Sequence, residues 1–217
     1  MKKYLFVFAV SSLLIVSCKK KDGAEPEPEP ISMPAKTFEK ITFNPTDAYF
    51  STDGSMTAAV DSTTAKTITG KIDITFLFDY SYTQPGFFDP VTRSKVWVWN
   101  DYYKKWLSTG VATQYYSTTL TKADFDAAKS DESKIASYFS AGTFILAPHS
   151  IFPTGSCIGG RQSSGPSSLL LAQGNVFGFK NTVSGKRGLL YIRTDQYSGW
   201  PAPITSPNTK VDIIREN

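Results

Sequence analysis

A chain of 217 residues with a net charge of +4 is long enough to bury one sizeable hydrophobic core, and its charge is too small to favour nucleic-acid binding. From Ile31 onward the net charge is +3, so setting the N-terminal segment aside leaves no strongly basic domain. Aromatic residues make up 14% of the chain and charged residues only 19%, a balance that favours β-strands and argues against a helical protein.

Residues 1–17 are predicted to be a signal peptide. Lys2 and Lys3 precede an apolar run that is shorter than the roughly 20 residues of a membrane-spanning helix. The segment Leu14-Ile15-Val16-Ser17, directly before Cys18, resembles the lipobox of bacterial lipoproteins. That resemblance implies cleavage before Cys18, a diacylglyceryl group on its thiol and acylation of the new N-terminus. The membrane is therefore the first partner that we expect, held through a lipid anchor.

Residues 18–30 are predicted to be the lipidated cysteine and an extended linker. Proline alternates with glutamate from Glu25 to Pro30, and the segment should behave as a semi-rigid spacer because proline fixes φ and like charges repel. Lys19, rather than an aspartate, follows the cysteine. By resemblance to lipoprotein sorting rules, this implies localisation at the outer membrane. Whether the domain faces the periplasm or the cell surface stays open.

Residues 31–217 are expected to form a single β-rich domain. Its first predicted strand carries Ile41 and Phe43 on one face and ends at the turn Asn44-Pro45-Thr46-Asp47. Asp53-Gly54 is a hairpin signal, which predicts that residues 48–52 pair with residues 55–60.

The clearest strand pattern runs from Thr67 to Asp79. Apolar residues recur there with a period of two, which predicts a strand with one buried face. The residues on that face are Ile72, Ile74, Phe76 and Phe78. The next stretch, Ser81–Asp89, contains the turn pair Pro85-Gly86 and is predicted to be a loop.

Two more strands are predicted before the middle of the chain. In Ser94–Asn100, Val96 and Val98 alternate with Trp97 and Trp99, so one of the two pairs faces the core. The second strand, Val111–Leu120, is rich in threonine and tyrosine.

A short helical insertion is predicted between Thr121 and Ser140. Thr121 and Asp124 have the spacing of a capping box, although aspartate is weaker than glutamate at the second position. Ser130-Asp131 resembles a second N-cap, so two short helices fit the pattern as well as one. Ala141-Gly142 is expected to end the helical stretch.

The C-terminal part returns to β-structure. Thr143–Ala147 is predicted to be a strand, and Pro148–Ser168, dense in glycine, proline and serine, a long loop of the kind that is usually functional or disordered. The remaining strand candidates are residues 169–171, 176–179, 189–193 and 210–214, with a hairpin turn at Ser184-Gly185-Lys186. The fold class that these elements predict is mostly β, a β-sandwich-like domain with a helical insertion.

The hairpin from Val176 to Ile192 resembles the closing hairpin of a group of cell-envelope lipoproteins from Bacteroidota. In that group an aromatic strand leads through a Gly-Lys-x-Gly-Leu turn to an apolar strand, as Val176–Lys180 and Gly185–Ile192 do here. The Asp124–Asp126 stretch and the helix of Ile135–Phe139 are also similar to the group. The resemblance covers the C-terminal half of the chain and implies a β-sandwich-like fold without implying an activity.

The residues that usually carry catalysis are sparse, and we expect neither an enzyme nor a cofactor or metal site. His149 is the single histidine, and no cysteine cluster with metal-binding spacing is present. We interpret Cys157 as a buried small apolar residue and the glycine-rich run around it as a flexible loop. Paired carboxylates would serve a hydrolase, but the sequence does not show which of them face each other. The candidates are Asp73, Asp79, Asp89, Asp101, Asp124, Asp126, Asp131, Glu132, Asp195 and Asp212.

Aromatic side chains are the one enriched class with a functional interpretation. Exposed tryptophan and tyrosine rings stack against the apolar C–H face of sugars. Envelope lipoproteins of Bacteroidota in general often bind glycans, and the resemblance therefore implies glycan binding as a candidate role. The ligand-binding hypothesis names Trp97, Trp99, Tyr102, Trp106 and Trp200. The competing interpretation, which we favour for Trp97 and Trp99, is packing in the core or at an interface.

Three functions follow in order of preference. The first is a non-catalytic outer-membrane lipoprotein with a binding or structural role, with glycan binding through the exposed aromatics as its sharpest form. The second is an accessory subunit of an envelope protein complex, with residues 148–168 contacting the protein partner. The third is a carboxylate-dependent hydrolase.

Overall fold

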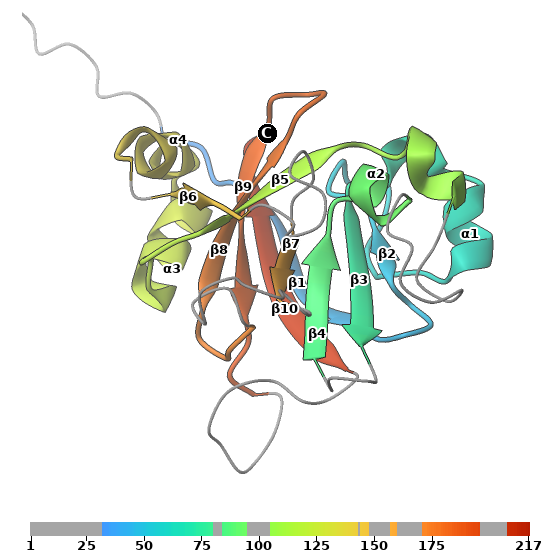
Figure 1. Cartoon of the computed structure of the whole chain (residues 1–217). Coiled ribbons are helices and arrows are strands. Elements are labelled where there is room, and N and C mark those ends of the chain that lie inside the picture. The colour runs from blue at the N-terminus through green and yellow to red at the C-terminus, as the bar shows by residue number, and fades with distance from the viewer. Residues whose placement is uncertain are drawn as a thin grey trace, which may run out of the picture. The chain divides into compact units, whose positions relative to one another are not determined.

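The computed structural model describes residues 32–79, 84–94, 105–142, 144–147, 157–159, 171–195 and 208–217. One group of strands comprises β1 (Lys36–Phe43), β5 (Thr113–Ser117), β6 (Ile145–Leu146), β8 (Val176–Asn181), β9 (Arg187–Ile192) and β10 (Thr209–Arg215). The other comprises β2 (Tyr49–Phe50), β3 (Ile74–Asp79), β4 (Gln84–Phe88) and β7 (Cys157–Gly159). Within these ranges the strands form two antiparallel sheets, in the orders β1-β10-β9-β8-β5-β6 and β2-β3-β4-β7 (Figure 1).

Short helices accompany the two sheets. They are α1 (Ser62–Lys66), α2 (Pro90–Arg93), α3 (Lys122–Ser130) and α4 (Ser133–Ser140), with the 3-10 turns η1 (Thr69–Lys71) and η2 (Lys105–Thr109). Figure 1 shows α3 and α4 on one side of the larger sheet and the smaller sheet on its other side. The described part of the chain is therefore mostly β and sandwich-like with a small helical part, which confirms the predicted fold class.

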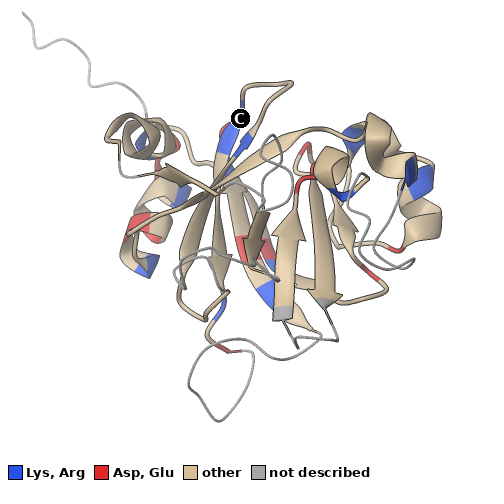
Figure 2. Ribbon diagram, viewed as in Figure 1, with Lys and Arg blue, Asp and Glu red and all other residues tan. Residues whose placement is uncertain are grey.

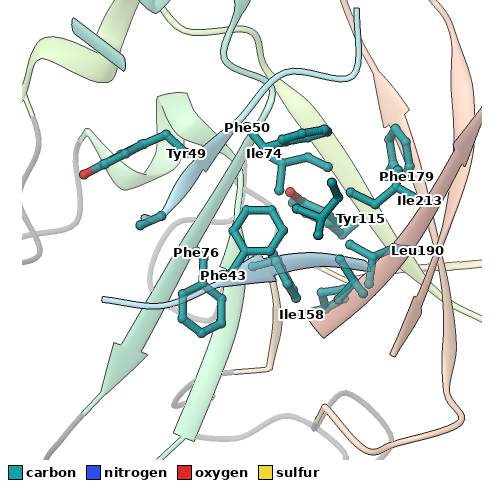
Figure 3. Packing of buried hydrophobic residues seen from close by; sticks show 14 of the residues in the cluster. Phe43, Tyr49, Phe50, Ile74, Phe76, Tyr115, Ile158, Phe179, Leu190 and Ile213 are labelled. Atoms are coloured by element: carbon teal, nitrogen blue, oxygen red, sulfur yellow. The ribbon is translucent and has the colours of Figure 1, made fainter. Parts of the chain in front are cut away.

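The main core lies between the two sheets. Phe43 of β1, Phe76 of β3 and Phe87 of β4 are fully buried there, and the rings of Phe43 and Phe87 meet edge to face with centroids 5.0 Å apart. Figure 3 shows Phe43 and Phe76 converging with Leu190 and Ile213 from the larger sheet. Burying one such side chain contributes about 1.5–3 kcal/mol, so this core is what joins the sheets.

A second core lies between the larger sheet and helices α3 and α4. Leu189 and Tyr191 of β9 contribute to it, whereas their neighbours Leu190 and Ile192 belong to the core between the sheets. Successive side chains of a strand point to opposite faces, so a continuous apolar run serves both cores. Phe125 of α3 completes the contact, with its ring centroid 5.6 Å from that of Tyr191.

Several of the predicted local signals are confirmed. Thr121 and Asp124 form the capping box of α3, and the helical stretch divides into two helices because the Asp131 side chain accepts a hydrogen bond from the Ser133 N–H. The Asn44 side chain accepts hydrogen bonds from the N–H groups of Thr46 and Asp47, which fixes the predicted turn. The hairpin of β8 and β9 turns at Gly185, where φ is +73°.

The loop predicted for Ser81–Asp89 is wrong, because residues 84–88 form strand β4 between β3 and β7. Pro85 pairs with Phe78 of β3, while β7 reaches only as far as Gly86. On the β7 side the proline therefore has no paired residue, and its missing N–H leaves no ladder hydrogen bond unmade there.

Two other predicted elements are shorter or different. The strand predicted from Thr67 begins only at Ile74, because α1, capped by the Asp61 side chain, and η1 occupy the preceding residues. The hairpin predicted around Asp53-Gly54 is reduced to a single bridge between Tyr49 and Val60, since β2 pairs with β3 instead.

The long loop predicted for residues 148–168 is wrong at its centre. Cys157, Ile158 and Gly159 form β7 and are buried, so they belong to the smaller sheet rather than to a flexible loop. The burial of Cys157 confirms that it packs as a small apolar residue. Leu171 is buried without belonging to a strand, and the strand predicted for Ser94–Asn100 lies outside the described residues apart from Ser94.

Candidate functional site

Of the aromatic residues predicted to bind a ligand, Trp106 is described. Trp97, Trp99, Tyr102 and Trp200 lie outside the described residues, as does Cys18. Trp106 belongs to η2 and is partly buried against the core, with its ring centroid 5.1 Å from that of Tyr49. The Arg93 guanidinium approaches the Tyr49 ring, 5.0 Å from its centroid. Packing against the core therefore covers part of the Trp106 side chain.

A polar cavity lies at another place, where β1, β9 and β10 meet the start of α3. Its volume is about 290 Å³. The lining residues are Glu39, Lys122, Tyr191, Arg193, Thr194, Asp195 and Asp212. Figure 2 shows acidic and basic residues together on α3, which contributes Lys122 to this lining. We refer to this cavity as the polar pocket.

A β-bulge in β1 shapes the wall of the polar pocket. Phe38 pairs with Ile213 and Ile41 with Val211, so Glu39 and Lys40 together stand opposite Asp212. Lys40 has φ of +56°, a left-handed conformation that is costly for a residue with a Cβ. Its backbone N–H donates to Asp212 Oδ1 at 2.8 Å, which compensates part of that cost. Bulges of this kind re-aim side chains, and here Glu39 becomes part of the pocket lining.

Arg193 holds two carboxylates of the polar pocket in place. Its Nε and Nη2 donate to the two oxygens of Asp195 at 2.8 and 2.9 Å, a bidentate pair. Its Nη1 donates to Asp212 at 2.9 and 3.1 Å. The hydrogen bonds from Arg193 lower the pKa of Asp195 to about 2, so this carboxyl is ionised at neutral pH.

Two lysines of α3 complete the charge pattern. Lys129 forms an ion pair with Glu39 across the rim, and this contact lowers the pKa of the Glu39 carboxyl. Lys122 donates to the carboxylate of Asp126 at 2.5 and 2.6 Å, while its ammonium lies 5.1 Å from the ring centroid of Tyr191.

These contacts decide what the polar pocket can do chemically. The lining carries three carboxylates against two cations, a balance that disfavours an anionic ligand. Ion pairs hold the carboxylates of Glu39 and Asp195 ionised, so they are suited to accepting hydrogen bonds and not to donating a proton. Across the described ranges, no group of three or more acidic, histidine or cysteine residues is arranged to hold a metal ion.

Sequence reasoning reached only part of this site. Asp195 and Asp212 were among the ten carboxylate candidates, but the sequence did not show that they face the same arginine. Arg193 and Asp195 directly follow β9 and stand two residues apart, close enough in sequence for their side chains to pair. Glu39 lies in the lining because of the bulge in β1, and no residue pattern predicted that bulge.

Comparisons with known proteins give a weak structural match. No protein-family model matches the chain, and a search of the curated proteins finds no match. A comparison with solved structures finds a DUF4466 family protein from Parabacteroides merdae, with 12% sequence identity and a TM-score of 0.48. The alignment covers 84% of this chain and 53% of that protein, so the chain spans about half of its length. No helix in the described parts of the chain combines the length and the hydrophobicity needed to cross a bilayer.

Proposed function

We propose that this chain is a non-catalytic, lipid-anchored binding protein of the outer membrane and that its polar pocket binds a carbohydrate. The observation that supports the ligand class is the joint presence, in one cavity of about 290 Å³, of an aromatic ring and ion-paired polar groups. The ring belongs to Tyr191, and the polar groups are the carboxylates and the guanidinium around it. The proposed location of the protein at the outer membrane rests on the signal sequence, the lipobox before Cys18 and Lys19 after it.

The chemistry of sugars matches this lining. Sugar hydroxyls donate hydrogen bonds to ionised carboxylates, and such charge-assisted bonds are about twice as strong as neutral ones. The bidentate pair of Arg193 with Asp195 fixes its acceptor oxygens before a ligand arrives. Preorganised groups lose little conformational entropy on binding, which is what an uncharged, strongly hydrated ligand requires for measurable affinity.

The same contacts weigh against the hydrolase alternative. A glycosidase needs one carboxyl with a raised pKa that protonates the leaving group. In the polar pocket the pKa of Glu39 and that of Asp195 are both lowered by cationic partners. We therefore propose binding rather than hydrolysis at this site.

Binding is tested by titrating the full chain, solubilised in detergent, with maltohexaose, cellohexaose, xylohexaose and chitohexaose. We expect saturable binding of at least one of these oligosaccharides, and calorimetry measures it. Asp195→Asn keeps the shape of the side chain but removes its charge, and it should weaken that binding about tenfold or more, because a hydrogen bond to a charged group contributes about 1.5–3 kcal/mol.

Two further variants locate the site. Asp131→Asn changes a partly exposed carboxylate outside the polar pocket and should leave the affinity unchanged. Trp106→Phe tests the aromatic site predicted from the sequence. If Trp106→Phe abolishes binding while Asp195→Asn does not, the ligand binds near η2 and the assignment to the polar pocket is wrong.

The accessory-subunit alternative is favoured by a different feature. The side chains of Ile145 and Leu146, on edge strand β6, are 69% and 43% exposed. Apolar side chains on an open sheet edge form the kind of surface that protein partners cover. A flat result with all four oligosaccharides, for the wild type and for every variant tested, would shift the assignment to this alternative.

A further inference from the structure

Lys122 lies across the aromatic ring of the polar pocket. Its ammonium is 5.1 Å from the ring centroid of Tyr191 and 5.7 Å from that of Phe125. Tyr191 lines the pocket, yet only 5% of its surface is exposed. The Lys122 ammonium thus lies over the ring that would stack against a sugar.

The contacts of Lys122 are weak ones. Its side chain is 44% exposed, and its ion-pair partner Asp126 is also exposed. The pair has the i,i+4 spacing with lysine first, the less favourable order, and exposed pairs of this kind contribute little. Lys122 is also the first residue of α3, where the positive end of the helix dipole disfavours a cation. Helix stability therefore does not explain a lysine at this position.

We propose that Lys122 is a displaceable cover over Tyr191 and that a bound sugar ring takes the place of its ammonium. This inference rests on the proposed carbohydrate binding and specifies how the ligand lies. The apolar face of the sugar stacks on the Tyr191 ring, and its hydroxyls reach the carboxylates held by Arg193. The displaced ammonium remains near Asp126 or enters water, so the ion pairs of Arg193 and Lys129 are unchanged.

Measurements of sugar affinity test directly whether Lys122 covers Tyr191. The full chain and its variants are titrated with the same four hexasaccharides. Lys122→Ala removes the cover, so the ligand no longer displaces a cation–π contact, and binding should tighten by about threefold to tenfold. Lys122→Arg keeps a cation over the ring and should bind no more tightly than the wild type. Lys134→Ala, an exposed lysine of α4 outside the pocket, is the matched control and should have no effect.

A spectroscopic signal gives an independent measurement. The methylene group next to the Lys122 ammonium lies near two aromatic rings, whose ring currents should shift its proton resonances upfield. On saturation with the bound hexasaccharide, these resonances should move to the position of an exposed lysine. The signals of Lys134 should stay where they are.

The outcomes separate the two proposals. If the wild type binds a hexasaccharide and Lys122→Ala weakens or does not change that binding, Lys122 is not a cover and this inference is overturned, while carbohydrate binding stands. If Lys122→Ala binds where the wild type shows nothing, both proposals are supported. If neither protein binds any of the four, the proposed function is wrong and the cover is overturned with it.

Discussion

Asp73 is a carboxyl group in the interior of the protein, next to the first residue of β3. It accepts hydrogen bonds from the backbone N–H of Thr52 at 2.9 Å and from the Thr52 hydroxyl at 2.5 Å. Burial disfavours the ionised form more than these contacts favour it, so the pKa of Asp73 is raised to about 6. In the alternating pattern predicted from Thr67 to Asp79, Asp73 falls on the face opposite Ile72 and Ile74, which would leave it outside the core. The structure buries it instead.

This raised pKa predicts a dependence of stability on pH. Between pH 4 and 6 the folded protein holds a proton on Asp73 that the unfolded chain has already released. The contribution of Asp73 to stability therefore falls as pH rises through that window and is constant above it. A shift of about two pKa units corresponds to roughly 3 kcal/mol.

Asp73→Asn should remove this slope, because an amide does not titrate and its oxygen still accepts from the Thr52 N–H. Urea unfolding at pH 4, 5, 6 and 8 measures the effect. We expect the variant to gain stability relative to the wild type as pH rises. Asp131→Asn is a control with the opposite sign. Hydrogen bonds from Ser133 lower the pKa of Asp131, so the contribution of this carboxylate to the stability of the wild-type protein is lost as pH falls. Parallel pH profiles for Asp73→Asn and the wild type would contradict the assignment.

Strand β7 shows how a short element depends on one residue. Gly159 has φ of +73°, and a Cβ added there would lie 2.4 Å from the Pro85 carbonyl oxygen and 2.7 Å from Leu171 Cγ. The close approach of β7 to β4 therefore requires glycine at this position. This explains why a glycine-rich sequence, which suggests a loop, forms the edge of the smaller sheet.

Gly159→Ala and Gly185→Ala separate this steric effect from backbone strain. Both glycines have φ of +73°, but nothing lies within 4 Å of a Cβ at Gly185. Gly185→Ala should cost about 1–2 kcal/mol from strain alone. Gly159→Ala should cost about 1–3 kcal/mol more, because β4 must move. Chemical denaturation of the two variants measures the difference, and equal losses would show that β7 has room to adapt.

At the scale of the whole molecule, both cores belong to the part of the chain that begins near Ala35. Every buried apolar side chain of the two clusters lies between Ala35 and Ile214. We therefore expect a chain starting at Ile31 to fold without the signal segment and the linker. Its thermal unfolding, followed by circular dichroism, should be one cooperative transition with the midpoint of the full chain. A markedly lower midpoint would mean that residues before Ile31 stabilise the domain.

The sequence by itself determined the features that arise from neighbouring residues. The capping box of Thr121 and Asp124, the turn at Asn44 and the hairpin turn at Gly185 are local, because their hydrogen bonds join residues a few positions apart. Together they were sufficient to predict a mostly β, two-sheet fold with a helical insertion.

Only the tertiary structure decided which distant residues meet. Glu39, Asp212 and Lys122 lie far apart in the chain and share the polar pocket because β1 pairs with β10 through a bulge and α3 packs beside them. Strands β4 and β7 likewise exist because a neighbouring strand supplies their hydrogen bonds, against the local preference of Pro85, Gly86 and Gly159. Strand pairing and register depend on contacts across the whole chain, so no local pattern of residues specifies them.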